Sequence, residues 1–460
     1  MIQMTKFLTQ LRRKLPRPGS VLSATEAPSV FSGDKWFAAH RPDAVVFPES
    51  ASDVAAVMQV AAMHSLPVTP RGAGYGYVGG CVPAQGGIVL AMERMNRIME
   101  IHDRDFVAVV QPGVITGDLQ ARVRRKGLFY PPDPASLKDC SLGGNIATNA
   151  GGPRCLKYGV TRSYVLGLEV VLIDGTIVRL GGRTHKNKTG FDLVGLFVGS
   201  EGLLGVVTEA TLRLLPHPPA RAVLSAGFKD MRAAARAIRA IFAEGFLPAA
   251  CEVADEFTLN AARSFRPDAA FPPGAAHLLV ELDGQAASVK SEVRQVARLL
   301  KSMHSTEIRT ATDEPSCQAL WDLRRAFSMS LKATGLRKLN EDIVVPRGRL
   351  VDLVAFAARL QKSSGFPIAC FGHAGDGNIH VNIMVGDYEQ PDIRARADAA
   401  LDTLFSQILE WNGAITGEHG VGIAKMPWWA AALTPENRAL HQTIKSALDP
   451  SGRLNPGKFV

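Results

Sequence analysis

The chain has 460 residues, of which 46% are hydrophobic, so it is long enough for two or three domains with buried cores. Its formal net charge of +9 comes from 52 basic and 43 acidic residues that are spread along the chain. This pattern favours an anionic ligand, an acidic protein partner or a membrane surface and predicts no nucleic-acid partner. No run approaches the ~18 consecutive apolar residues of a membrane span.

An N-terminal helical segment is predicted over residues 1–40. Its first twenty residues hold five basic side chains and no acid. The apolar residues fall on one helical face: Met4, Phe7, Leu8, Leu11 and Leu15. Two interpretations are open, a solvated helix that ends at Pro16 or a short targeting or membrane-surface helix. The first is favoured because no small-residue cleavage site follows.

Strands of a mixed sheet are predicted between about Arg41 and Leu215, where short Val/Ile/Leu runs alternate with turns. They are GGIVLAM, FVAVVQPGV, VLGLEVVLIDGTIVRL and LGVVTEATLRLLP. Helices are predicted from Asp53 to His64 and from Gly117 to Lys126. The three prolines of LPHPPA (Leu215–Ala220) should stop both helix and ladder, which predicts a linker to a second domain.

The second domain is predicted to be α+β, with helices laid on one antiparallel sheet. Helical segments around Met231–Glu244 and Ala286–Met303 alternate with the strand-like runs AHLLVELDG and FPIACFGHAG. The chain's six cysteines lie far apart with no CxxC pair, which excludes a thiolate zinc site and an iron–sulfur cluster. Reduced thiols and a cytoplasmic location are therefore expected.

The glycine-rich segment RGAGYGYVGG has the spacing of a dinucleotide fingerprint, but its context excludes a Rossmann fold. A helix should follow the third glycine, whereas here a loop leads to a predicted strand at Ile88–Met92. Consecutive glycines still let backbone N–H groups face phosphate oxygens. Similar segments recur at PPDPAS, SLGGNIATNAGGPRCLKYGVTR and FVGSEGLLGVVTEA, which predicts a long, phosphate-bearing ligand.

In this order the segments resemble the FAD-binding domain of the vanillyl-alcohol oxidase and p-cresol methylhydroxylase superfamily. Within it the chain is similar to the FAD-linked 2-hydroxy-acid dehydrogenases: D-lactate dehydrogenase, the glycolate oxidase flavoprotein subunit and D-2-hydroxyglutarate dehydrogenase. The resemblance runs from about Asp43 to Val460 and implies an α+β fold in three parts. These are an FAD-binding domain of the p-cresol methylhydroxylase type (residues 41–218), a substrate or cap domain with an antiparallel sheet covered by helices and a metal site (219–425), and a C-terminal segment that returns to the FAD domain (426–460).

The resemblance also implies which residues contact FAD. They are Arg71, Gly72, Ala73, Gly74, Gly76, Gly79, Gly80, Pro132, Asp133, Ser136, Gly143, Gly144, Asn145, Asn149, Gly151, Gly152, Gly159, Glu201, Gly202, Gly205, Val206 and Asn455. The group commonly has Thr and Ser in the first loop where this chain has Tyr75 and Val78, so those side-chain hydrogen bonds are not expected. Covalent members have a histidine near Tyr75, and its absence here predicts non-covalent FAD.

The segment FGHAGDGNIHVNI holds two histidines around a Gly-Asp-Gly turn. After the turn, polar and apolar residues alternate, which predicts a strand with His380 and Asn382 on one face. The turn would fold His373 back toward His380, and ITGEHGVG offers Glu418 as a third ligand. Two imidazoles and a carboxylate suit Zn²⁺, Fe²⁺ or Mn²⁺. The alternative is two structural histidines and a surface acid, but the resemblance implies that His373, His380 and Glu418 bind a divalent metal.

A reaction follows from the resemblance. The metal would act as a Lewis acid on the hydroxyl of a 2-hydroxy acid, with hydride transfer to the flavin. His419 is the candidate general base. Arg324 and Lys338 would pair with the substrate carboxylate, and Asn382 would hold the substrate or support a ligand. An exposed arginine and a surface lysine are the plainer interpretations of Arg324 and Lys338.

The predicted function is FAD-dependent oxidation of a D-2-hydroxy acid, D-lactate being favoured, to the 2-oxo acid. Glycolate or D-2-hydroxyglutarate are alternative substrates. A flavin-binding subunit without its own chemistry and a metal-dependent hydrolase or oxygenase without flavin are alternative functions. No NAD site is visible, so electrons should pass to a quinone, a cytochrome or an electron-transfer flavoprotein. A peripheral position at the inner membrane face and a homodimer are left open.

Overall fold

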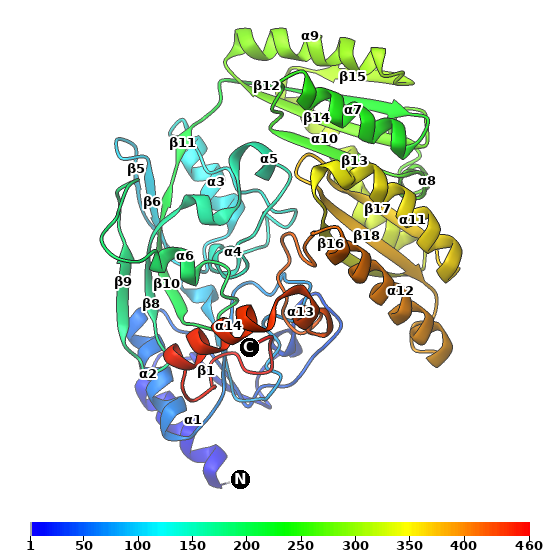
Figure 1. Cartoon of the computed structure of the whole chain (residues 1–460). Coiled ribbons are helices and arrows are strands. Elements are labelled where there is room, and N and C mark those ends of the chain that lie inside the picture. Colours follow the sequence, from blue (N-terminus) through cyan, green and yellow to red (C-terminus); the bar gives the residue numbers. More distant parts are fainter. Residues whose placement is uncertain (1) are drawn as a thin grey trace. The chain divides into compact units, whose positions relative to one another are not determined.

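The computed structural model describes residues 2–460, which form two compact units of the predicted α+β class (Figure 1). Unit 1 contains the residues up to Gly151 together with Val160–His217 and Glu418–Val460. Unit 2 contains Gly152–Gly159 and Pro218–Gly417. The boundary at His217–Pro218 falls inside the proline-rich segment that predicted a linker.

The described part of unit 1 has two main sheets and one two-stranded sheet, where one mixed sheet was expected. The first is mixed and has the order β1-β2-β4-β3, with β1 antiparallel to β2 and with β4 parallel to both β2 and β3. Its strands are β1 (Val21–Ser23), β2 (Ala44–Val46), β3 (Val68–Arg71) and β4 (Ile88–Ala91). Both faces are buried: Val46 packs in one core cluster and Val45 in another, as alternation along a strand requires.

The second sheet of unit 1 is antiparallel, with the order β5-β6-β10-β8-β9. Its strands are β5 (Ile98–His102), β6 (Val107–Val110), β8 (Val165–Val171), β9 (Ile177–Gly181) and β10 (Val206–Arg213). A short ladder joins β7 (Leu128–Phe129) to β11 (Leu215–Pro216). The expectation that the prolines stop every ladder was therefore wrong for Pro216, which pairs with Leu128 at the end of a two-residue strand.

The N-terminal helix α1 (Ile2–Lys14) is part of the core of unit 1. Phe7, Leu11 and Leu15 are buried in the same cluster as the apolar face of α2 (Ala51–Met63). The interpretation as a wholly solvated helix was wrong, and the same burial leaves this apolar face covered rather than open to a membrane. The side chains of residues 2–5 are not described, so the expectation for Met4 lies outside the described residues.

The other helices of unit 1 are short, except for the last. They are η1 (Ser29–Ser32), η2 (Met92–Arg94), α3 (Thr116–Arg124), α4 (Leu142–Thr148), η3 (Thr161–Tyr164), α6 (Leu193–Phe197), α13 (Met426–Ala432) and α14 (Pro435–Leu448). The predicted helices at residues 53–64 and 117–126 correspond to α2 and α3. Among the described residues, no helix is long and apolar enough to cross a membrane.

Unit 2 is built on one seven-stranded antiparallel sheet, which confirms the prediction for the second domain. The order is β15-β12-β14-β13-β17-β18-β16. The strands are β12 (Ala220–Phe228), β13 (Ala250–Ala254), β14 (Ala276–Gly284), β15 (Glu307–Ala311), β16 (Arg337–Val344), β17 (Ile368–His373) and β18 (Asn378–Val385).

Helices cover both faces of this sheet (Figure 1). One face packs on α8 (Glu256–Phe265) and α10 (Glu314–Ala333), where Phe327 contacts Phe371 of β17. The other helices are α7 (Met231–Ala243), α9 (Ala286–Ser302), η4 (Arg347–Arg349), α11 (Leu350–Ser364) and α12 (Pro391–Glu410). Aspartates cap three helices through their N–H groups, Asp230 for α7, Asp255 for α8 and Asp313 for α10.

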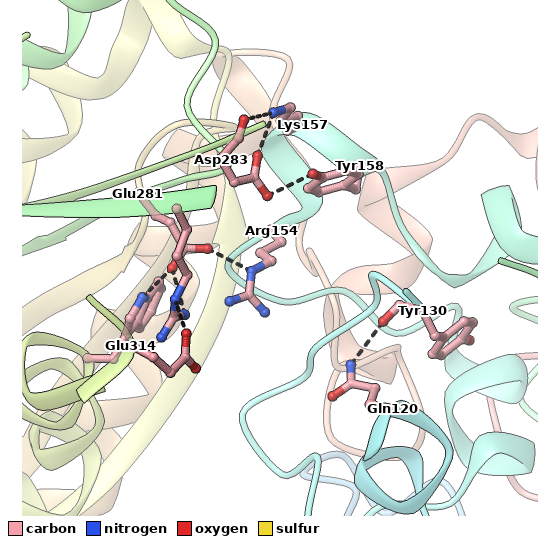
Figure 2. Close-up of polar contacts among 10 residues, drawn as sticks. Gln120, Tyr130, Arg154, Lys157, Tyr158, Glu281, Asp283 and Glu314 are labelled. Carbon is pink, nitrogen blue, oxygen red and sulfur yellow. Dashed lines mark hydrogen bonds and ion pairs between the residues drawn. The ribbon is translucent and has the colours of Figure 1, made fainter. Parts of the chain in front are cut away.

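Residues 152–159, called the strap below, belong to unit 2 although both neighbouring segments of the chain lie in unit 1. The strap contains α5 (Cys155–Tyr158), and its polar side chains bind the end of β14 (Figure 2). Arg154 donates to Glu281 at 2.9 Å, and the Tyr158 hydroxyl donates to Asp283 at 2.7 Å. Lys157 also donates to Asp283. The strap is thereby attached to unit 2 by charged hydrogen bonds, which are stronger than neutral ones.

Candidate active site

The two histidines come together as the sequence predicted. β17 ends at His373, β18 begins at Asn378, and the imidazole centroids lie 5.6 Å apart at 80°. Both side chains are buried on the sheet face that packs on α10. His373 lies two residues after Phe371 and His380 four residues before Met384, so each histidine shares a strand face with a residue of that core cluster. The turn requires Gly377, which has φ +87°; a Cβ there would lie 2.1 Å from the Val345 carbonyl oxygen.

Glu418 completes a group of three side chains that could hold a metal ion. It follows Gly417, the last residue of unit 2, whose N–H donates to Asp342 at 2.9 Å. One ligand atom each from His373, His380 and Glu418 lies within 4.8 Å of the others. This donor set fits a divalent cation such as zinc, iron or manganese. Asp342, buried in β16, is a residue that the sequence analysis missed; it also accepts from Asn378 and Thr416 and so fixes the start of the Glu418 loop.

A second missed residue is Glu252 in β13, whose carboxylate contacts two of the predicted site residues. One oxygen lies 2.7 Å from His373 Nδ1 and the other accepts from Arg324 Nε at 2.6 Å. Complete burial raises the pKa of Glu252, but the charged guanidinium of Arg324 and the hydrogen bonds from His373 and Arg324 outweigh this effect and hold the pKa below its usual value. Glu252 is therefore an anion at any ordinary pH. Its sequence signal is an acid in the middle of the apolar strand ACEVA.

Arg324 is placed for anion binding rather than on a solvated helix face. Its guanidinium lies over Phe371 at 4.9 Å, and only 11% of the side chain is exposed. Its terminal nitrogens make no hydrogen bond within residues 2–460, so they are free to bind a carboxylate. The neighbouring Arg325 is half exposed and pairs with Asp322 on the helix surface.

Lys338 in β16 lies against the face of α10 that carries Arg324. It donates to Ser328 Oγ at 3.0 Å, and Ser328 lies one helical turn after Arg324. Burial, aided by nearby Lys332, lowers the pKa of Lys338 to about 8. Asn382 is buried and its amide nitrogen donates to the carbonyls of Ala369 and His380, so it braces the ladder between β17 and β18.

In unit 1 the predicted cofactor segments converge. Ser141 accepts from the N–H groups of Ala73 and Gly144, which joins the first glycine loop to the start of α4. At the end of α4, Ala147 accepts from the N–H of Glu201. Asn455 donates to the carbonyls of Gly80 and Glu201, so the C-terminal segment returns to the same place.

The positions of the other predicted cofactor residues vary. Asn149 has φ +52° and accepts from Arg162 N–H, Asp133 and Asn145 are buried, and Val206 begins β10. Arg71, Gly72, Gly74, Gly76 and Gly79 belong to the first loop, Gly143 to α4, and Gly202 and Gly205 to the turn before β10. Pro132 and Ser136 lie in the segment before α4, and Gly151 ends a part of unit 1. Gly152 and Gly159 are the two ends of the strap in unit 2, so their part in the cofactor site remains a prediction.

Buried polar atoms in these loops fit a bound polar cofactor. Arg71 Nε, Asn455 Oδ1 and the Tyr130 hydroxyl are buried without a hydrogen-bond partner among the described residues. Gly80 opens on empty space, since a Cβ there would have no neighbour nearer than 4.0 Å. Such atoms are costly unless a ligand or water satisfies them. The convergent glycine loops and the unsatisfied atoms therefore fit the proposed FAD site.

Two further residues shape this region. Gln120 donates to the carbonyl of Tyr130 at 3.1 Å (Figure 2). It also donates to the carbonyl of Pro132 at 2.8 Å and so holds the PPDPAS segment. Asp34 accepts from Trp36 N–H, and burial raises the pKa of Asp34 to about 6. Neither residue was identified from sequence.

The loop that carries His419 is anchored within unit 1. Both carboxylate oxygens of Glu201 accept from backbone, one from Val421 N–H and the other from Gly422 N–H, each at 2.8 Å. The imidazole of His419 lies 5.4 Å from the ring of Tyr77. Glu201, predicted only as a cofactor residue, thus also fixes the glycine-rich turn after His419.

Comparison with known proteins now defines the class. Residues 42–181 match the family model described as FAD binding domain, and residues 217–459 match FAD linked oxidases, C-terminal domain. The chain belongs to the FAD-linked oxidase family and is an FAD-linked oxidoreductase.

Among its relatives, glycolate oxidase subunit GlcD of Bacillus subtilis (strain 168) is 40% identical over 418 residues, 91% of this chain and 89% of that protein. D-lactate dehydrogenase of Anaerostipes hadrus is 32% identical over 451 residues, 96% and 95% of the two chains. The solved structure of p-cresol methylhydroxylase with substrate bound has a TM-score of 0.80 at 20% identity and covers 100% of this chain and 97% of that one. This last likeness shows the p-cresol methylhydroxylase type of fold alone.

Proposed function

We propose that the chain oxidises a D-2-hydroxy acid, with D-lactate as the first candidate, to the 2-oxo acid, and that the electrons pass to an acceptor other than NAD. The observation that carries this proposal lies in unit 2. There His373, one of the two candidate metal ligands on this sheet, shares the buried Glu252 carboxylate with Arg324, whose terminal nitrogens make no hydrogen bond within residues 2–460. The relatives named as D-lactate dehydrogenase and glycolate oxidase subunit support the same substrate class.

When bound, non-covalent FAD supplies a hydride acceptor and the divalent metal supplies positive charge near the substrate hydroxyl. His373, His380 and Glu418 would hold the metal. Arg324 would take the substrate carboxylate with its two terminal nitrogens, and Lys338 would add a second positive charge. His419 would accept the hydroxyl proton. Asn382 would keep His380 in place through the strand contact.

Glycolate is the second candidate substrate, because the relative named glycolate oxidase subunit GlcD is 40% identical. D-2-hydroxyglutarate remains a third. These acids share the carboxylate and hydroxyl that Arg324 and the metal would bind, and they differ only in the group on the α-carbon. A flavin-free hydrolase or oxygenase disagrees with the matched FAD-binding domain. A quinone, a cytochrome or an electron-transfer flavoprotein would take the electrons.

The first experiment follows the bound flavin. The holoprotein is mixed anaerobically with D-lactate, L-lactate, glycolate and D- and L-2-hydroxyglutarate, and flavin absorbance is recorded before and after metal removal. We expect rapid bleaching by one D-acid or by glycolate, loss of bleaching on chelation, and recovery with Zn²⁺ or Mn²⁺. If none of the acids bleaches a flavin that is plainly bound, the proposed function is wrong.

A further inference from the structure

We infer that Glu252 is a positioning residue that serves metal binding and substrate binding at the same time. The inference rests on the proposed function, because it assigns one carboxylate to the orientation of both His373 and Arg324. Glu252 would contact neither the substrate nor the metal. It would act through the two side chains that do.

The contact of Glu252 with His373 follows from the sheet register, and its contact with Arg324 follows from the packing of α10 on the sheet. β13 and β17 are antiparallel neighbours, and Glu252 and His373 are directly opposite each other. Side chains of opposite residues point to the same face and lie within reach of one another. The third partner, Arg324, comes from α10, which covers this face. With no exposed surface, the carboxylate has these two partners in place of water.

For His373 the contact fixes the form of the ring. The carboxylate lies 2.7 Å from Nδ1 and is an acceptor only, so Nδ1 carries the proton. Nε2 is left as the nitrogen that can bind a cation. A carboxylate behind a histidine ligand both orients the ring and raises its basicity. The neutral, Nδ1-protonated ring is the form that a metal requires.

For Arg324 the same carboxylate fixes the direction of the guanidinium. Nε donates to Glu252 at 2.6 Å, and the plane rests over the Phe371 ring at 4.9 Å. These contacts occupy one edge and one face and leave the two terminal nitrogens for a carboxylate. Glu252 contacts both the His373 imidazole and the Arg324 guanidinium and so sets the distance between them. A substitution of Glu252 should therefore affect both metal binding and substrate binding.

Glu281 provides a matched control. It lies on β14, the strand next to β13, and is 1% exposed. It also accepts charged hydrogen bonds, from Arg154 at 2.9 Å, and accepts from Trp321 at 2.6 Å. Within residues 2–460, no hydrogen bond or ion pair joins it to a histidine. A general loss of stability from removing a buried carboxylate should therefore appear in both variants, whereas a loss of metal binding should appear only at Glu252.

The test compares Glu252→Gln with Glu281→Gln. Zinc affinity of the metal-free protein is measured by competition with a chromophoric chelator, and the KM for the best acid is measured in the zinc-loaded holoenzyme. His373 and Arg324 use different oxygens of Glu252, and in glutamine one of these becomes an NH₂ donor that cannot accept. Glu252→Gln should therefore weaken zinc binding about 10–100-fold and raise KM. Glu281→Gln should change zinc affinity less than about threefold, a range below that of ligand-supporting contacts. Wild-type zinc affinity in folded Glu252→Gln would overturn the inference.

A second measurement on the wild-type protein does not depend on the folding of a variant. Proton–nitrogen NMR of ¹⁵N-histidine-labelled, metal-free protein reports which ring nitrogen of His373 carries the proton, with His373→Asn identifying the signal. We expect the proton on Nδ1, and a proton on Nε2 alone would overturn the inference. The zinc and NMR results need no substrate, so a failure of every acid to bleach the flavin would contradict the proposed function and leave the test of Glu252 intact.

Discussion

At the scale of single residues, a local sequence motif predicts some site residues and misses others. The alternation in NIHVNI was enough to place His380 and Asn382 on one face of β18. Glu252 could not be found in this way, because its two partners lie 121 and 72 residues away and meet only through sheet pairing and helix packing. Arg324 and Lys338 were identified only by resemblance. The small exposure of Arg324 on α10 and the contact of Lys338 with Ser328 of the same helix now give a physical reason to expect a role.

The pH dependence of substrate binding tests Lys338. With a pKa of about 8, its ammonium is charged below pH 8 and is lost as the pH rises through that value. If the charge binds the substrate carboxylate, kcat/KM should fall roughly 10–100-fold on the alkaline side, the usual worth of a charged hydrogen bond. In Lys338→Arg the group stays charged, so the alkaline limb should move upward. Kinetics with the best acid across the pH range provide the measurement.

Lys332→Arg is the control, because Lys332 is exposed at the end of α10, close to Lys338, and the exchange preserves its charge. It should leave the alkaline limb unchanged. If Lys338→Arg and the wild type share one alkaline limb, another group causes it and Lys338 does not bind the carboxylate as a cation.

At the scale of elements, the predictions were best where periodicity was strong. The helices α2, α3, α7 and α9 and the strands β4, β6, β8, β9, β10, β14, β17 and β18 agree with the runs chosen from sequence, whereas strands such as β12 and β13 were not predicted. The pairing of strands into two sheets in unit 1 was not predictable, because strand order depends on contacts between distant segments. The turn between β17 and β18 is the element on which the metal site depends most.

Gly377→Ala tests that turn. A Cβ would combine an unfavourable φ of +87° with a contact of 2.1 Å to the Val345 carbonyl oxygen. We expect the free energy of unfolding to fall by about 3 kcal/mol or more, and zinc affinity to fall with it. Urea denaturation of the metal-free protein measures the first effect.

The matched variant is Gly386→Ala, just beyond β18, where a Cβ would meet nothing within 4 Å. It should change stability by less than about 1 kcal/mol. Equal stability of the two variants would mean that the turn tolerates a side chain and that its geometry does not depend on glycine.

For the whole molecule, the formal net charge is counted directly from the sequence, and folding does not change it. The net charge of +9 should attract anionic electron acceptors. Reoxidation of the reduced flavin by ferricyanide, a trianion, is therefore expected to slow about tenfold or more between low and high salt, while reoxidation by a neutral quinone changes little. Stopped-flow absorbance at several ionic strengths checks this. Equal salt dependence for both acceptors would exclude electrostatic attraction of the anion.

The path of the chain also has a consequence for biosynthesis. Unit 1 is interrupted by the strap at residues 152–159 and again by Pro218–Gly417, and it ends with Glu418–Val460. Lys445 donates to the carbonyls of Leu203 and Leu454 in the core. More than two hundred residues separate Leu203 from Lys445, so the ribosome makes all of them before the segment with Lys445 and Asn455 emerges. Unit 1 cannot complete its own interior until Glu418–Val460 has been synthesised. All residues of unit 2 are therefore made before the last segment of unit 1.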